Sequence, residues 1–373
     1  MKKNVIEMHA TWLTVNSVIG CTNNCKYCFL QSNNKNLANP IELVTPKESI
    51  QMLLQSKYYI KDIPICLLPN TDVFLNSTNT KYLMELLLEI KNNNIKNPLI
   101  IITKCGIPSE FISYIKDIAI DKQLVVYISY SGLGKSIEPN VDINKIKENF
   151  KLLYDNNIKM IHYFRPLIPE NSNVEKIKDV LNYVSKYTKY SVITGLKIKK
   201  EYFNKLDFWP KLKNYKEECI NSDGVWDKKA FDYFYKYYDL NQYIFQTNAC
   251  ALSSILNKPK LEYYCTYECN NFNLCSLKQR KLCQKNYKSI DYEQLKETII
   301  YNLKKIEKYY PALIINIDKK QNSVVLENVD LEVGDLAFLS YVCHIKITTS
   351  NRNKKEKYFN STLNSAKPFI IGD

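Results

Sequence analysis

The sequence contains little arginine and no long apolar run. Lysine and arginine together number 52, yet arginine occurs only as Arg165, Arg280 and Arg352. Arginine is the usual reader of base edges in the DNA major groove, so its scarcity argues against direct sequence reading. Because no run of eighteen apolar residues is present, we expect no membrane-spanning helix and no membrane partner. The start, MKKNVIEMHA, has no apolar stretch of signal-peptide length, and we expect a cytoplasmic protein.

Histidine is also scarce, and His9, His162 and His344 lie far apart in the sequence. None has a nucleophile or a carboxylate at a spacing that suggests a catalytic pair. We therefore assign no histidine to catalysis and interpret His162 as a wall residue of the fold.

The net charge of +14 makes a nucleic acid or a nucleotide a candidate partner, because lysines along a groove neutralise phosphates. The alternative is a solvated lysine surface, since the chain is rich in the Asn, Ile, Tyr and Lys that AT-rich coding favours. Charge alone leaves both interpretations open.

Cysteine, by contrast, is abundant, with twelve residues. In a reducing compartment this number argues for metal ligation rather than disulfides. Cys21, Cys25 and Cys28 lie in GCTNNCKYCF with gaps of three and two residues. Three thiolates at this spacing can hold three corners of an iron–sulfur cube and leave the fourth iron open to a small molecule. A zinc knuckle that lacks one ligand and a set of buried thiols are the alternatives.

The residues before this triplet, LTVNSVIG at 13–20, predict a strand that ends at the cysteines. Active sites of α/β barrels lie at the carboxyl ends of their strands. The strand, the triplet and Tyr27 resemble the radical S-adenosylmethionine (radical SAM) enzymes. The resemblance implies a [4Fe-4S] cluster on the three cysteines, S-adenosylmethionine at the open iron beside Tyr27, and a 5′-deoxyadenosyl radical. It also implies an electron donor such as flavodoxin or ferredoxin.

Short apolar runs alternate with helical patterns up to about residue 198, which predicts an α/β fold with a parallel sheet. Helices are expected after Thr45, around residues 82–90, and after the caps Asp142 and Asn173. Six such units match the partial (β/α)6 TIM-like barrel that the resemblance implies. The expected strands are 13–20, 63–68, 98–103, 124–130, 159–164 and 191–198.

We expect three regions. Residues 1–200 form the barrel, 201–310 form a helical, cysteine-rich metal-binding appendage, and 311–373 form a small β-rich C-terminal module. The appendage is predicted to contain an aromatic helix at 226–238 and an amphipathic helix from a Ser289 cap to about residue 309. In the C-terminal module, residues 318–322 predict the first turn.

Four further motifs follow the predicted strands, namely LLPNTDVF, IIITKC, YISYSG with a later EP, and FRPLIPEN. In this order they resemble the spore photoproduct lyase-like, or DNA-repair photolyase, branch of the radical SAM proteins over about residues 10–200. The resemblance implies that Thr71 and Asp72 form its Ser/Thr-Asp pair near the amino group of S-adenosylmethionine. It assigns Lys104 to the methionyl carboxylate and Ser129 to the ribose.

The roles of these residues also have simpler interpretations. Lys104 could extend to solvent at the rim, and Thr71 or Ser129 could make only local hydrogen bonds. Arg165, at a strand end, is a candidate catalytic clamp for a carboxylate or phosphate, or a member of a structural ion pair. Glu138 fits substrate or ribose binding and fits an ordinary turn equally well.

The chain departs from the lyase at one position. The lyase carries a hydrogen-donating cysteine three residues before the aspartate that matches Asp72, and this chain has Pro69 there. Cys66 and Cys105 lie nearby in the sequence, and we interpret both as core thiols. Repair of spore photoproduct with the same hydrogen donor is therefore not predicted.

A second cysteine group follows the predicted barrel. Its last four members have the spacing C-x3-C-x5-C-x7-C and could close a structural zinc site. We favour an auxiliary [4Fe-4S] cluster, because members of the resembled superfamily carry such clusters after the barrel. The number of ligands stays ambiguous among Cys250, Cys265, Cys269, Cys275 and Cys283. We interpret Cys219 and Cys343 as isolated buried thiols.

We therefore predict a radical SAM enzyme with lyase-like or transferase chemistry that acts on a nucleic acid base or a nucleotide. The substrate class depends on the resemblance and on the basic charge. One rival is a peptide-modifying radical SAM enzyme. The other is a non-catalytic protein in which both cysteine groups bind zinc and the lysines contact RNA.

Overall fold

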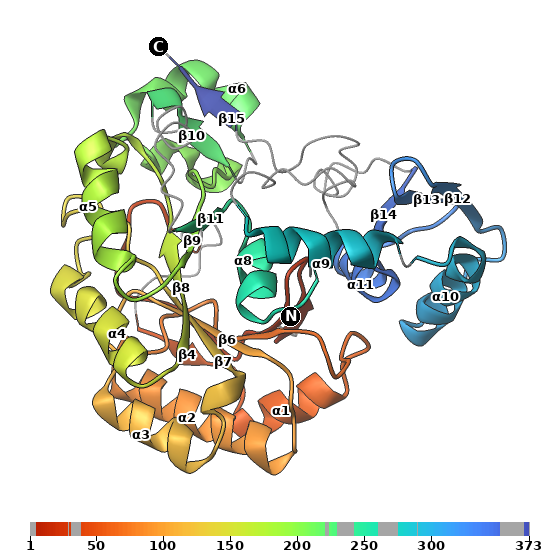
Figure 1. Cartoon of the computed structure of the whole chain (residues 1–373), viewed down its shortest axis with the longest axis horizontal. Helices are drawn as coiled ribbons and strands as arrows, with labels where there is room; N and C mark the ends of the chain where they lie inside the picture. The colour runs from red at the N-terminus through yellow and green to blue at the C-terminus, as the bar shows by residue number, and fades with distance from the viewer. Residues whose placement is uncertain are drawn as a thin grey trace.

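A mostly parallel sheet forms the centre of the protein (Figure 1). The computed structural model describes residues 5–28, 30, 39–220, 224–229, 242–259, 275–288, 290–350 and 369–372. The strand order is β1-β2-β5-β6-β7-β8-β9-β11. Within this sheet, and among the described residues, the β1–β2 pair is antiparallel and the other pairs are parallel. The strands are β1 (Ile6–Met8), β2 (Leu13–Val15), β5 (Ile65–Leu67), β6 (Leu99–Thr103), β7 (Leu124–Ile128), β8 (Lys159–Phe164), β9 (Tyr190–Ile193) and β11 (Tyr243–Phe245).

The predicted α/β class with a parallel sheet is confirmed, and a strand lies at each of the six predicted positions. The first predicted strand breaks after Val15, because β3 (Val18–Ile19) pairs instead with β4 (Ile41–Glu42). The last ends at Ile193, and Leu196 bridges to Val225. Every residue of β2, β5 and β7 is buried. Parallel strands covered on both faces are continuous apolar runs, which is why the sequence predicts them well.

Five helices connect the successive strands from β4 to β9, and they cover the outside of the sheet (Figure 1). The side chains of Thr45, Asp142 and Asn173 cap three of them, as predicted. Their inner faces are apolar; in α2, for example, Leu83 and Ile90 are buried. The helices are α1 (Pro46–Leu54), α2 (Ser77–Asn92), α3 (Ser109–Asp117), α4 (Ile143–Asp155) and α5 (Val174–Val184).

A second, smaller core combines the loops after β7 and β8 with the segment after β9, so that Leu133 and Ile168 are buried together with Leu196, Trp209 and Cys219. Beside it, β10 (Val225–Asp227) pairs in parallel with β15 (Phe369–Ile371). The prediction that a helix begins at Trp226 is therefore wrong, because the partner that makes this segment a strand is distant in the sequence. Lys228 and Lys229, which follow β10, are helical as predicted, and the predicted helix residues from 230 to 238 lie outside the described residues. This region also contains 3₁₀ turns at 200–205 and 210–215, α6 (Lys216–Cys219) and α8 (Asn248–Ile255).

The C-terminal region begins with α9 (Leu277–Lys288) and α10 (Tyr292–Lys305). The cap of α10 is Asp291, whose carboxylate accepts from the Glu293 and Gln294 amides, so the predicted Ser289 cap is wrong. A hairpin of β12 (Ile314–Asp318) and β13 (Ser323–Glu327) follows, and Asp318 Oδ1 accepts from the Lys320 and Gln321 amides in its turn. The predicted turn at 318–322 is confirmed.

A buried helix, α11 (Val333–Cys343), lies within the module that the sequence predicted to be β-rich. Its apolar residues occur on all sides, so the sequence shows no helical stripe. It connects β13 to the parallel strand β14 (Lys346–Thr349). The helix packs on β1, and the ring of Phe338 lies 5.7 Å from that of Tyr58. The C-terminal region thus shares the main hydrophobic core. No helix in the described ranges is both long and apolar enough to cross a membrane.

Candidate metal and cofactor site

The cysteine loop, residues 20–28, lies across the carboxyl end of the parallel sheet. Its Gly20 amide donates to the Asn70 carbonyl (3.0 Å), after β5, and its Lys26 amide donates to the Ile137 carbonyl (3.0 Å), after β7. Parallel α/β folds place their sites at this end of the strands. The loop that carries the three N-terminal cysteines is therefore where a functional site is expected.

The path of the cysteine loop depends on residues that tolerate positive φ. Gly20 has a φ of +109°, and a Cβ on it would lie 3.1 Å from the Asn39 carbonyl oxygen. Asn24 has a φ of 53°, a left-handed conformation that asparagine adopts more readily than most residues. The sequence before and between the cysteines thus allows the chain to turn here.

Cys25 is buried, Cys21 and Cys28 are half-buried, and the three thiols lie close enough to influence one another. Burial raises the pKa of Cys21 and of Cys25 to about 12, and it also raises the pKa of Cys28. The neighbouring cysteines raise the pKa of Cys21 further, while the Lys104 ammonium lowers that of Cys25. Three adjacent thiols of raised pKa become thiolates only beside a strong cationic acceptor. Thiolates are the usual ligands of iron–sulfur clusters, so the residue types fit such a cluster, but in this structure the three side chains do not form a group arranged to hold a metal ion.

A buried polar network, the Glu138 network, lies next to these thiols. Lys104 Nζ donates to Glu138 Oε1 (2.7 Å), and Ser131 Oγ lies 3.1 Å from each carboxylate oxygen. The Tyr27 hydroxyl donates to the same carboxylate, and Lys104 Nζ lies 5.5 Å from the centre of the Tyr27 ring. Burial acts to lower the pKa of Lys104, but the charges of Glu138 and Cys25 raise it overall. Lys104 therefore stays protonated, and it does not extend to solvent.

Asp72 and Thr71 lie after β5 and are both buried. Asp72 Oδ1 accepts from Thr103 Oγ1 (2.8 Å), and its Oδ2 accepts from the Lys104 amide (2.6 Å). Asp72 thus fixes the backbone at the end of β6, from which the Lys104 side chain extends. Thr71 Oγ1 accepts from Asn79 Nδ2 (3.0 Å), one of the local hydrogen bonds that the sequence left as an alternative.

Ser129 and Arg165 follow β7 and β8 at the same end of the sheet. Ser129 is buried, and its amide donates to the Thr103 carbonyl (2.8 Å). Arg165 Nη1 donates to the Tyr163 hydroxyl (2.6 Å), and the peptide bond between Arg165 and Pro166 is cis. The structure therefore brings Thr71, Lys104, Ser129 and Arg165 to the edge that carries the cysteine loop.

The second cysteine group is only partly described. Cys250 lies in α8, Cys283 lies in α9, and Cys275 lies just before α9. Gln279 Nε2 donates to Cys283 Sγ (3.3 Å). Cys265 and Cys269 lie outside the described residues. Among the side chains that the structure does place, no group of three or more His, Cys, Asp or Glu is arranged to hold a metal ion.

His162 has the structural role that the sequence predicted. It is fully buried, its Nε2 donates to the Tyr130 carbonyl (2.8 Å), and its Nδ1 accepts from Ser191 Oγ (2.9 Å). Burial lowers the pKa of His162 to about 4. Cys66 is likewise a fully buried core thiol in β5. Cys105 differs, because Asn23 of the cysteine loop donates to its sulfur (3.4 Å) and links it to the site.

Sequence reasoning did not assign the centre of the polar network. The sequence predicts Glu138 only as a turn or ligand-binding residue, and it carries no signal for Ser131 or Asn23. The EP dipeptide after β7 was the available signal for Glu138. Its pairing with Lys104 needs the strand order, which brings the ends of β6 and β7 together.

In sequence, no protein-family model and no curated protein matches the chain. In structure, it is similar to spore photoproduct lyase complexed with dinucleoside spore photoproduct, with a TM-score of 0.46 and 10% identity. The match covers 65% of this chain and 80% of the lyase chain. A mutant of that lyase with bound AdoMet and the same dinucleoside gives 0.45 and 8% identity over 65% and 80%. Native anSMEcpe with bound AdoMet gives 0.37 and 15% identity over 56% and 62%.

Proposed function

We propose that the chain is a radical SAM enzyme whose [4Fe-4S] cluster is held by Cys21, Cys25 and Cys28. One observation carries the proposal: the loop with Cys21, Cys25 and Cys28 lies across the carboxyl end of a parallel sheet, and the Lys104–Glu138 pair lies next to Cys25. When bound, the cluster supplies the electron that splits S-adenosylmethionine into methionine and a 5′-deoxyadenosyl radical.

The Glu138 network would receive the amino acid end of S-adenosylmethionine. That end is a zwitterion, and the network offers the Lys104 ammonium to its carboxylate and the Glu138 carboxylate to its amino group. The charge of Glu138 raises the pKa of Lys104 and keeps it protonated. The ring of Tyr27 packs against the Lys104 ammonium. Thr71 is proposed near the amino group and Ser129 near the ribose, while Asp72 acts as a positioning residue for Lys104.

We assign the six parallel strands from β2 to β9 and their covering helices to a partial (β/α)6 barrel over about residues 1–200, and β11 (Tyr243–Phe245) extends the same sheet from beyond this range. Residues 201–310 would form an appended metal-binding region, and residues 311–373 a C-terminal module. The second hydrophobic core spans the first of these boundaries, because Ile168 and Leu196 belong to it together with Trp209. In the appended region, an auxiliary [4Fe-4S] cluster on the later cysteines is our preference over zinc.

The proposed substrate is a nucleic acid base or a nucleotide. The net charge of +14 supports an anionic partner, and Arg165 at the end of β8 is a candidate phosphate ligand. The proposed electron donor is a flavodoxin or ferredoxin, and the proposed location is the cytoplasm.

The test is anaerobic reconstitution of the full chain with iron and sulfide, followed by reduction in the presence of S-adenosylmethionine. We expect absorbance near about 400 nm, together with 5′-deoxyadenosine and methionine. Cys25→Ser should remove both products and the absorbance of the N-terminal cluster. Cys219→Ser, which alters a buried thiol of the second core, is the matched control and should retain both.

A colourless protein that binds zinc alone would contradict the proposal and favour the metal–RNA alternative. So would equal amounts of 5′-deoxyadenosine from wild type and Cys25→Ser. Iron quantification separates loss of the cluster from loss of turnover, because a correctly folded variant without iron at the N-terminal site identifies the ligands independently of activity.

A further inference from the structure

The three-stranded sheet of β12, β13 and β14, here called the C-terminal sheet, has an edge strand, β12, that could bind another chain. The strand order is β12-β13-β14, and within the described residues β12 pairs only with β13. An edge strand presents a row of backbone N–H and C=O groups that can pair with another extended chain. In Figure 1, this sheet and α10 lie on the side of the molecule opposite α4 and α5.

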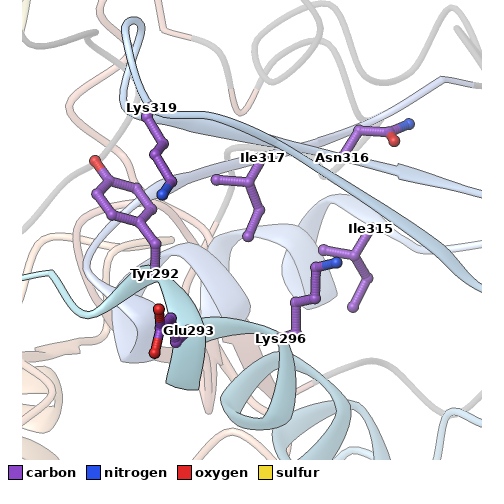
Figure 2. A pocket seen from close by; sticks show the side chains of 7 residues that line it. All are labelled: Tyr292, Glu293, Lys296, Ile315, Asn316, Ile317 and Lys319. Atoms are coloured by element: carbon purple, nitrogen blue, oxygen red, sulfur yellow. The ribbon is translucent and has the colours of Figure 1, made fainter.

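A cavity of about 510 Å³ lies between this edge strand and the first turns of α10 (Figure 2). Tyr292 and Lys296 of α10 line one side, and Ile315 and Ile317 of β12 line the other. Both isoleucines are half-buried and belong to the same face of the strand. The cavity therefore joins an apolar floor to an open row of backbone hydrogen-bonding groups.

The charged side chains of the cavity favour an anionic ligand. Lys296 and Lys319 line it, and within the described residues neither makes an ion pair. Lys319 Nζ lies 5.4 Å from the centre of the Tyr292 ring, and Figure 2 shows it reaching toward that ring. Glu293 is the one acidic side chain in the lining. Two lysines against one glutamate leave the lining with a net positive charge, which suits a ligand with a few separate carboxylates.

We propose that the groove between α10 and β12 binds an extended acidic peptide segment of a partner protein. The segment adds to the sheet as a fourth strand beside β12 through backbone hydrogen bonds. Its apolar side chains pack on Ile315 and Ile317, and its acidic side chains pair with Lys296 and Lys319. This interaction is independent of the proposed radical chemistry at the other site.

The test uses the intact chain and a displayed library of random twelve-residue peptides. Selection on wild type, with K296E/K319E as the counter-selection, should recover peptides in which apolar and acidic residues alternate. A synthetic recovered peptide should bind the wild type about ten times more tightly than K296E/K319E in fluorescence anisotropy. Lys304→Glu, an exposed lysine of the same helix outside the cavity, is the matched control and should change affinity less than about twofold.

Two further measurements test the binding mode. Backbone amides of β12 should gain protection from hydrogen exchange when the peptide binds. A version of the peptide that is N-methylated at alternate residues should lose most of its affinity, because it cannot complete the strand ladder. Circular dichroism confirms that each variant is folded.

The proposal is overturned if selection recovers no peptide that distinguishes wild type from K296E/K319E. It is also overturned if the β12 amides gain no protection from hydrogen exchange, or if N-methylation of the peptide leaves its affinity unchanged. A third contrary result is complete displacement of the peptide by a twelve-nucleotide oligothymidine at equal concentration. The last result would assign the lysines to nucleic acid.

Discussion

Lys104 Nζ lies 2.7 Å from Glu138 Oε1, and the two side chains are only 15% and 3% exposed. The residues are 34 positions apart; Lys104 directly follows β6, and Glu138 lies in the loop between the neighbouring strand β7 and α4. A buried ion pair of this kind contributes little net stability, but removal of one partner leaves a buried charge without compensation. The site is therefore sensitive to any change that unbalances the pair.

Glu138→Gln should lower the free energy of unfolding by about 3 kcal/mol, because it leaves the buried Lys104 ammonium unpaired. Urea denaturation of the protein without cofactors measures this loss. Glu148→Gln, at an exposed position of α4, is the matched control and should change stability by less than about 0.5 kcal/mol. The double variant Lys104→Met/Glu138→Gln should recover part of the loss. Equal stability of Glu138→Gln and wild type would show that the pair does not persist in solution.

Gly20→Ala should cost about 2 kcal/mol, because it places a side chain at a φ of +109° and a Cβ close to the Asn39 carbonyl. Under the proposed function it should also reduce the iron bound after reconstitution, since Gly20 starts the cysteine loop. Gly134→Ala is the control, because a Cβ there meets no atom within 4 Å. If both variants melt at the same temperature and bind equal iron, the positive φ of Gly20 is not required.

Acidification from pH 7 to pH 5 should destabilise the protein partly through His162. The pKa of His162 is about 4 in the folded state against 6.5 for an ordinary histidine, so the unfolded chain binds more protons between these values. The contribution of the neutral His162 ring to the free energy of unfolding is fully present above about pH 6.5, and it decreases as the pH drops toward 4. The expected loss at this site between pH 7 and pH 5 is about 2 kcal/mol. Urea denaturation at the two pH values measures it, and His162→Gln should show a smaller loss.

Asp335→Ala should cost about 3 kcal/mol, because the buried carboxylate receives several donors. Its Oδ1 accepts from the Tyr58 hydroxyl (2.7 Å) and from Lys57 Nζ (3.2 Å), and its Oδ2 accepts from the Glu332 amide (3.0 Å) at the start of α11. Burial acts to raise the pKa of Asp335, but these partners lower it overall. Thermal melting measures the effect, with the exposed Asp117→Ala as control. An unchanged melting temperature would refute the role of this carboxylate.

The sequence was most informative where local chemistry determines the structure. Apolar runs such as LVVYI located buried parallel strands, and Thr45, Asp142 and Asn173 located helix starts. The cysteine spacing located the candidate site without any structure. These features depend on neighbours within a few residues, which is why a single sequence predicts them.

Features that depend on distant partners were missed. Trp226 is in a strand because β15 pairs with it, and the apolar sequence of α11 has no helical stripe because the helix is buried on nearly all sides. The Lys104–Glu138 pair also requires the strand order. The assignment of Thr71, Ser129 and Arg165 to a bound cosubstrate or substrate stays a prediction.

The hydrogen bond from Tyr58 to Asp335 joins residues 277 positions apart. During synthesis, β1 and the segment around Tyr58 cannot acquire their covering helix until α11 has left the ribosome. For most of translation, the amino-terminal half therefore exposes apolar surface to chaperones and proteases. A nascent chain that stalls before residue 333 is expected to be degraded rather than to accumulate as a free-standing barrel.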